Sequence, residues 1–125
     1  MDENDVGEKL LGCALKVHRA LGPGLLENAY EACLCHELTR AGIEHQRQLA
    51  QPVVYDGLKI DLGYRLDLLV EKKVVVEVKA IATLTDLHRS QLLSYLKLGG
   101  YRLGYLLNFN VKMLKDGISR MANDL

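Results

Sequence analysis

The stretch Asp67-Leu-Leu-Val-Glu-Lys-Lys-Val-Val-Val-Glu77-Val-Lys79 decides the fold of this chain. Its first run, Tyr64 to Val70, is mostly apolar but carries Asp67, and its second, Val74 to Val78, holds four valines and Glu77. Apolar, β-branched runs bounded by charged residues predict two buried strands joined by a tight reversal. Alternation along the second strand places Glu77 and Lys79 on one face.

Charged groups in strands this apolar are costly to bury unless they pair or hold a cation. A two-residue turn at Lys72-Lys73 would put Asp67 and Glu77 on opposite faces of the hairpin, whereas a three-residue loop or a β-bulge would bring them together. We predict one of the latter two. The alternative is an edge hairpin whose Glu and Lys side chains lie in water.

The composition is that of a globular chain, with 125 residues, 49% hydrophobic and 26% charged. We expect one compact domain, residues 1–125. No apolar run reaches the roughly 20 residues of a membrane span. The polar, acidic start is unlike a secretory signal, so a cytoplasmic location is expected. Three cysteines are an odd number for a disulfide framework and are predicted to be free thiols.

The formal net charge of zero argues against a large non-specific nucleic-acid surface. From His88 onward, however, six Lys or Arg residues stand against only two acids. This basic third could follow a phosphate backbone, although charge alone favours an ordinary solvated surface.

Two helices are predicted before the strands. Asn4 or Asp5 can cap a first helix that runs to about Ala20, and a second extends from about Leu25 to Ala41. Glu27 lies within the apolar stripe of the second helix. The alternative is a first-turn glutamate favoured by the helix dipole.

Four further elements follow from turn and periodicity signals. Asp56-Gly57 predicts a hairpin turn, and Thr83 or Thr85 opens a helix that runs to about Leu98. That helix is apolar nearly all round, which predicts deep burial, with Gln91 in the middle of one apolar side. Tyr101 to Phe109 predicts a strand parallel to the valine strand, and Val111 to Met121 a short amphipathic tail.

Five polar residues thus occupy faces that ought to be apolar: Glu27, Asp67, Glu77, Lys79 and Gln91. Separate burial of each would cost several kcal/mol without partners. A shared pocket removes most of that cost, especially around a divalent cation, because carboxylate oxygens and water are the usual ligands of Mg²⁺.

The chain resembles the PD-(D/E)xK nuclease superfamily, in which an acid on one strand precedes Glu-x-Lys on the next. Asp67 and Glu77-Val78-Lys79 match that pattern. Gly24-Leu-Leu-Glu27-Asn-Ala-Tyr30 is similar to the signature of one branch, the GxxExxY proteins. Gln91-Leu-Leu-Ser-Tyr95 and Leu106-Leu-Asn-Phe109 resemble its later blocks. Leu66 departs from the proline of the superfamily name.

The resemblance implies an α/β fold with a restriction-endonuclease-like αβββαβ core, whose mixed sheet is flanked by helices. It further implies metal-dependent hydrolysis of phosphodiester bonds, most often in DNA. Asp67, Glu77 and the carbonyl of Val78 would bind Mg²⁺ or Mn²⁺, and Glu27 would hold a second cation or a metal-bound water. Lys79 would orient the attacking water.

Gln91 would position that water or a phosphate. Arg65 is expected to share the face of Asp67, where it would neutralise a carboxylate or contact a phosphate. Tyr30 and Tyr95 are assigned mainly to packing, with a phosphate contact as the alternative. A homodimer is expected because the chain is close to a bare core. The competing hypothesis is an inactive module of the same fold that binds nucleic acid or a protein partner.

Overall fold

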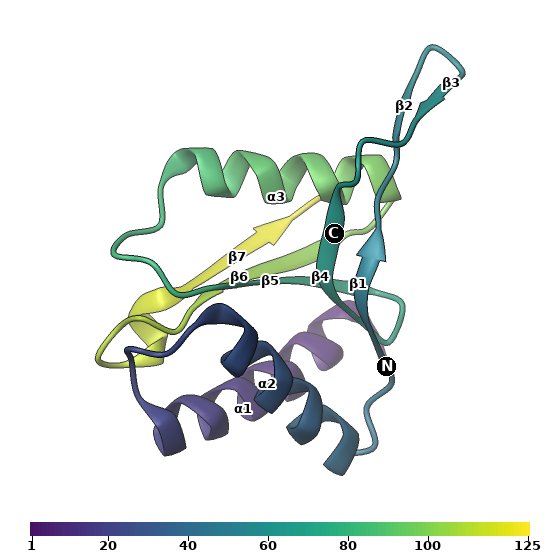
Figure 1. Ribbon diagram of the computed structural model, residues 1–125. Coiled ribbons are helices and arrows are strands. Elements are labelled where there is room, and N and C mark those ends of the chain that lie inside the picture. Colours follow the sequence, from purple (N-terminus) through teal and green to yellow (C-terminus); the bar gives the residue numbers. More distant parts are fainter.

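The computed structural model describes residues 1–125 and has helices on both faces of a five-stranded mixed sheet (Figure 1). The elements are α1 (Glu3–Leu21), α2 (Glu27–Arg40), β1 (His45–Ala50), β2 (Val53–Tyr55), β3 (Leu58–Ile60), β4 (Arg65–Val70), β5 (Val74–Lys79), α3 (Asp86–Gly99), β6 (Leu103–Asn108), the 3₁₀ turn η1 (Leu114–Gly117) and β7 (Ile118–Ala122). The sheet order is β1-β4-β5-β6-β7. Only the β5–β6 pair is parallel. The predicted α/β class is confirmed.

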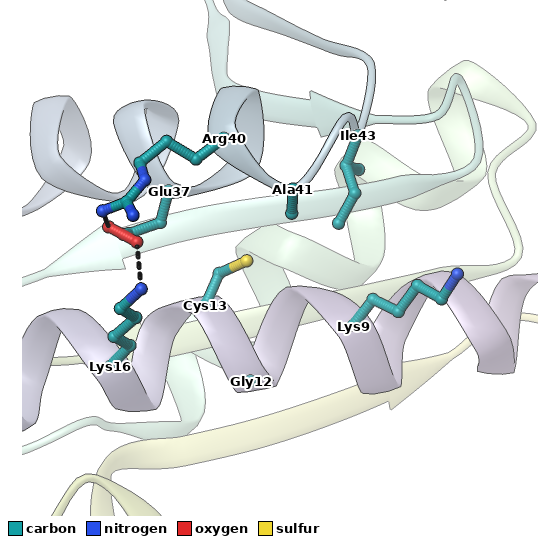
Figure 2. A pocket seen from close by; sticks show the side chains of 8 residues that line it. All are labelled: Lys9, Gly12, Cys13, Lys16, Glu37, Arg40, Ala41 and Ile43. Atoms are coloured by element: carbon teal, nitrogen blue, oxygen red, sulfur yellow. Dashed lines mark ion pairs between the residues drawn. The ribbon is translucent and has the colours of Figure 1, made fainter.

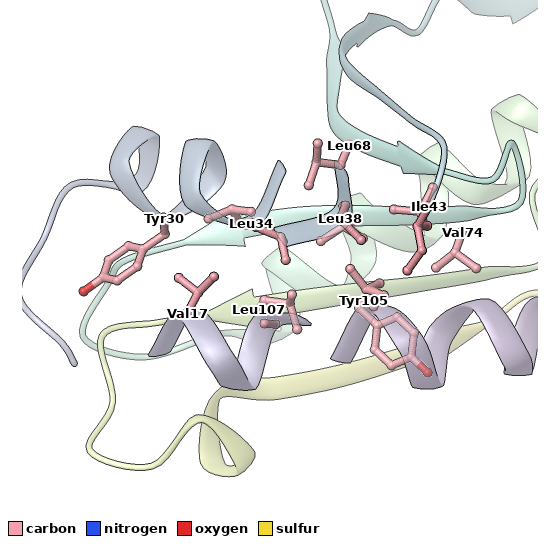
Figure 3. Packing of buried hydrophobic residues seen from close by; sticks show 14 of the residues in the cluster. Val17, Tyr30, Leu34, Leu38, Ile43, Leu68, Val74, Tyr105 and Leu107 are labelled. Carbon is pink, nitrogen blue, oxygen red and sulfur yellow. The ribbon is translucent and has the colours of Figure 1, made fainter. Parts of the chain in front are cut away.

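The larger core lies between the sheet and the two N-terminal helices (Figure 3). Residues from α1 and α2 pack on the faces of β4, β5 and β6 that carry Leu68, Val76 and Tyr105. Tyr30 stacks on Phe109 with ring centroids 4.6 Å apart. Each fully buried side chain of this size contributes about 1.5–3 kcal/mol, so this layer holds α2 firmly against the sheet.

Helix α3 covers the other face, through a different side from the one predicted. Leu92 and Leu96 are buried there, and a Cβ built on Gly104 of β6 would lie 3.0 Å from Leu96. The absence of a side chain at Gly104 therefore allows the helix to approach closely. Leu87 and Gln91 are exposed, so the expected deep burial of α3 is wrong. A single helix packed on a sheet buries only one of its faces. When the sequence is apolar all round, it does not specify which face that is.

The β4–β5 hairpin has the predicted three-residue loop, Glu71 to Lys73. The register pairs Val70 with Val74 and Leu68 with Val76, so the next residues along, Asp67 and Glu77, lie opposite one another. The loop places Glu71 and Lys72 in the left-handed region, with φ of 52° and 57°.

Helix boundaries differ slightly from the predicted ones. Helix α1 is capped by Asp2 in a capping box with Asp5, not by Asn4 or Asp5. Helix α2 begins at Glu27, two residues later than expected, because Leu26 is still extended. The prediction that Thr85 caps α3 is confirmed, and His88 completes its capping box.

The predicted turn at Asp56-Gly57 is present, with φ of 49° and 77°. It closes β2 and β3 into a separate two-stranded arm that projects from the body (Figure 1). The amphipathic tail predicted over Val111 to Met121 is partly wrong, because its last four residues belong to β7, an edge strand antiparallel to β6. No helix is both long enough and apolar enough to span a membrane.

Candidate active site

The predicted site begins where β4 separates from β5. The backbone ladder between these strands ends at Leu68 and Val76. One residue further, the side chain of Asp67 replaces the backbone: its Oδ2 accepts a hydrogen bond of 2.8 Å from the Val78 N–H. The carboxylate of Asp67 is thereby fixed at the edge of the strand that carries Glu77.

Glu77 is the least satisfied group in the molecule. It is 6% exposed, and its Oε1 is buried without a hydrogen-bond partner. Burial, followed by the negative charge of Asp67 and hydrogen bonding to that carboxyl, raises the pKa of Glu77 to about 9, with Lys79 acting in the opposite direction. A buried, unpartnered carboxyl beside a second acid suits a divalent cation, which would supply both the missing ligand and the missing charge.

Lys79 ends β5 on the same face as Glu77 by strand alternation. Its carbonyl accepts from the Phe109 N–H at 2.9 Å, which ties its backbone to β6. The side chain is half-buried and takes part in none of the ion pairs of the structure. The amine is thus free to act on a ligand near Glu77.

Glu27, the first residue of α2, lies at the end of β5. Its Oε2 accepts a hydrogen bond of 3.1 Å from the Ala80 N–H. It does not join the acid pair, because no three His, Cys, Asp or Glu side chains gather closely enough to hold a metal ion. The structure therefore brings Asp67 and Glu77 together and leaves Glu27 beside them.

Gln91 and Tyr95 on α3 line a hollow with Tyr64. Burial, then the charges of Glu77, Tyr64 and Asp67, raise the pKa of Tyr95. Arg65 is exposed and donates to the backbone carbonyl of Gln48 at 3.4 Å. It forms no ion pair with Asp67, so the expected neutralisation is absent.

Tyr30 is a packing residue. Its ring is fully buried, and its hydroxyl donates to the Gly22 carbonyl at 2.6 Å and accepts from the Leu25 N–H at 3.1 Å. Both hydrogen-bonding directions of the hydroxyl are used to hold the loop before α2, which favours the packing role of Tyr30 over a phosphate contact.

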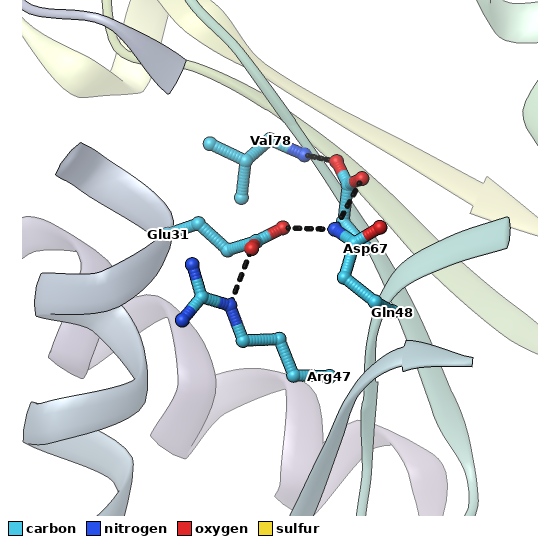
Figure 4. A network of polar contacts seen from close by, with 5 residues as sticks. All are labelled: Glu31, Arg47, Gln48, Asp67 and Val78. Atoms are coloured by element: carbon cyan, nitrogen blue, oxygen red, sulfur yellow. Dashed lines mark hydrogen bonds and ion pairs between the residues drawn. The ribbon is translucent and has the colours of Figure 1, made fainter. Parts of the chain in front are cut away.

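A polar network that the sequence did not reveal lies behind Asp67 (Figure 4). Glu31 is buried and accepts from Arg47 Nε at 2.5 Å and from Gln48 Nε2 at 3.0 Å. The same Gln48 nitrogen is 3.5 Å from Asp67 Oδ1. Gln48 adopts a φ of 54°, and the β1–β4 ladder skips its pair with Asp67. The feature of the sequence that could have pointed to Glu31 is its position one helical turn after Glu27.

Asn108 was also missed. It is buried at the end of β6, where its Oδ1 accepts from the Ile81 N–H at 3.1 Å and its Nδ2 donates to the Ile81 carbonyl at 3.0 Å. This two-way contact secures the segment that follows Lys79. Asn108 lies within the motif Leu106 to Phe109, and this position could have identified it as a candidate site residue.

A separate hollow of about 510 Å³ lies between α1 and α2, where Lys16 and Glu37 form an ion pair of 3.0 Å (Figure 2). It contains none of the predicted site residues. Cys13 lines it as a free thiol whose pKa is raised, chiefly by burial. All three cysteines are free, and they are half-buried, not fully buried.

Comparison with known proteins agrees with this geometry. A family model described as the PD-(D/E)XK nuclease superfamily matches residues 4–121. No match was found among curated proteins or among solved structures. The fold, the strand-borne Asp67 and the Glu77-Val78-Lys79 motif lie within the matched range, and the chain belongs to the PD-(D/E)XK nuclease superfamily.

Proposed function

We propose that this protein is a metal-dependent nuclease that hydrolyses phosphodiester bonds in DNA. It would be a member of the GxxExxY branch, folded as one domain over residues 1–125 and located in the cytoplasm. The observation that carries the proposal is the buried Oε1 of Glu77, which has no hydrogen-bond partner although it lies beside Asp67. Such a group is costly in a structural role and useful in a metal site.

Asp67 and Glu77, with the carbonyl of Val78, would hold Mg²⁺ or Mn²⁺. Two carboxylates fit these ions, which complete their coordination with water and substrate oxygens. When bound there, such an ion would supply Lewis-acid chemistry for phosphodiester hydrolysis. Glu27, whose Oε2 accepts from the Ala80 N–H, would hold a second cation or a water beside the first one.

Lys79 would orient the attacking water and offset the charge that develops on the phosphate. The half-buried amine without an ion pair supports this role. Gln91 would position the water or a phosphate oxygen, and the exposed Arg65 would contact the DNA backbone together with Tyr95. A homodimer would extend the surface available for the substrate.

The direct test is cleavage of plasmid and of labelled single-stranded DNA with Mg²⁺ or Mn²⁺. The Lys79→Ala variant should lose about 100-fold or more in rate, the usual effect of removing a group that stabilises transition-state charge. Lys72→Ala is the matched control, because Lys72 lies in the β4–β5 loop and is 72% exposed. Equal activity of the wild type and Lys79→Ala would overturn the proposal.

An inactive module of the same fold is the second candidate. The observation in its favour is that only two acids, not three, come together at the site. Calorimetric titration with Mn²⁺ separates the two candidates: a functional site binds the ion with an affinity that depends on Asp67 and Glu77, whereas an inactive one shows no such dependence.

A further inference from the structure

A hollow of about 350 Å³ lies between α3 and the segment that leads into β4. Its volume is within the range of about 300–1,000 Å³ typical of ligand pockets. Aromatic and aliphatic side chains, among them Tyr64, Tyr95 and Leu87, form most of its lining. Ser90, Gln91 and Ser94 of α3 supply neutral hydrogen-bonding groups.

Two tyrosines lie side by side in this hollow. The rings of Tyr64 and Tyr95 have centroids 6.2 Å apart and are tilted by 48°. Tyr64 is 45% exposed and Leu87 is 67% exposed, so both present apolar surface to an incoming molecule. An exposed aromatic ring beside aliphatic groups provides a stacking platform for a planar ligand.

The hollow adjoins the proposed metal site. Tyr95 packs against the α3-side core cluster, which contains Val75, two residues before Glu77 on the same face of β5. The charges of Glu77 and Asp67 both influence the pKa of the Tyr95 hydroxyl. Because Val75 and Glu77 share the face of β5 that α3 covers, a nucleotide bound in the hollow would lie on the same side of the sheet as Glu77.

We infer that the hollow binds a nucleobase of an unpaired strand, stacked on Tyr64, and thereby selects single-stranded DNA over duplex. This inference rests on the proposed nuclease function and specifies its substrate. Within a duplex both faces of a base are covered by its neighbours, so only an unstacked base can enter. The neutral groups of Ser90 and Ser94 match the uncharged edges of bases, and aromatic stacking tolerates any base.

The experiment measures fluorescence anisotropy of labelled single-stranded and blunt duplex oligonucleotides, in EDTA so that no cleavage occurs. The wild type should bind the single strand at least about fivefold more tightly than the duplex. Tyr64→Leu, which removes the ring at a partly exposed position, should weaken single-strand binding by about tenfold. Tyr64→Phe should retain it, because the stacking face remains.

Tyr55→Leu is the matched control, since Tyr55 is 72% exposed on the β2–β3 arm and does not line the hollow. It should bind like the wild type. If Tyr64→Leu also binds like the wild type, or if duplex binds as tightly as single strand, the inference is overturned.

The two proposals fail separately. If the wild type cleaves DNA and Tyr64→Leu binds as tightly as the wild type, the base pocket is rejected and the nuclease proposal stands. If binding depends on Tyr64 but no metal-dependent cleavage occurs, the nuclease proposal is rejected and the base pocket stands.

Discussion

The carboxylate of Asp67 accepts a hydrogen bond from the backbone N–H of Val78 at 2.8 Å, in the place where a strand partner would otherwise pair. This contact holds Asp67 beside Glu77 without the help of a ligand. It also leaves Oδ1 facing only the long contact of 3.5 Å with Gln48. A substitution to Asn keeps an oxygen for Val78, so it tests the charge of Asp67 with little disturbance of the strand.

Mn²⁺ should raise the melting temperature of the wild type, because an ion that binds only the folded state stabilises it by about 2.7 kcal/mol at 100 times its Kd. Asp67→Asn should lose most of this stabilisation, while Asp116→Asn, at an exposed position of η1, should keep it. Differential scanning fluorimetry across a Mn²⁺ titration measures both. An equal shift in Asp67→Asn would exclude Asp67 as a ligand.

Glu77→Gln should stabilise the metal-free protein increasingly as the pH rises. The folded pKa of about 9 exceeds the ordinary value of 4.5, so folded Glu77 keeps a proton that the unfolded chain releases between these values. The wild type therefore loses stability from this group from about pH 5 to pH 9, by at most about 1.4 kcal/mol per pH unit. Urea denaturation in EDTA at pH 5.5, 7 and 8.5 measures the difference between the two proteins, and a constant difference would contradict this reasoning.

Arg47→Met should lower the free energy of unfolding by about 2 kcal/mol, because it leaves the buried Glu31 carboxylate without its guanidinium partner. Lys16→Met is the control: Lys16 is 60% exposed, and its ion pair with Glu37 should be worth less than about 1 kcal/mol. Chemical denaturation gives both values. Similar small losses in the two variants would show that the Glu31 network adds little to stability.

Tyr30→Phe should destabilise the fold by about 1–2 kcal/mol and leave cleavage unchanged, because the lost hydroxyl bonds the Gly22 carbonyl and the Leu25 N–H. Denaturation and plasmid cleavage are measured on the same preparation. Normal stability with reduced cleavage would instead give Tyr30 a role at the substrate.

The hairpin register was predictable because burial and turn length act on the same few residues. Placing Asp67 and Glu77 on one face required a loop with an odd number of residues or a β-bulge. The structure has a loop of three residues. The parallel pairing of β5 with β6 was predictable for a similar reason, since a strand, a helix and a strand in this order favour it.

Other features depend on contacts that local sequence does not encode. The pair of Glu31 and Arg47 joins a helix to an edge strand, and neither residue is unusual in its own segment. The left-handed backbone of Gln48 occurs where the β1–β4 ladder skips its pair with Asp67. Strand β7 is hard to tell from a tail because an edge strand can carry polar residues, here Ser119 and the exposed Arg120.

The projecting arm of β2 and β3 is a place where the length of this chain can change. Its base is closed by the hydrogen bond of 2.8 Å from the Gln51 N–H to the Tyr64 carbonyl, and its strands belong to a sheet of their own. Inserting residues in facing pairs at the tip would lengthen the arm, and deleting such pairs would shorten it. Either change would keep the alternation of side chains between the two faces of the arm. The start of β4 would stay anchored, so insertions and deletions here would leave the spacing of the acidic pair intact.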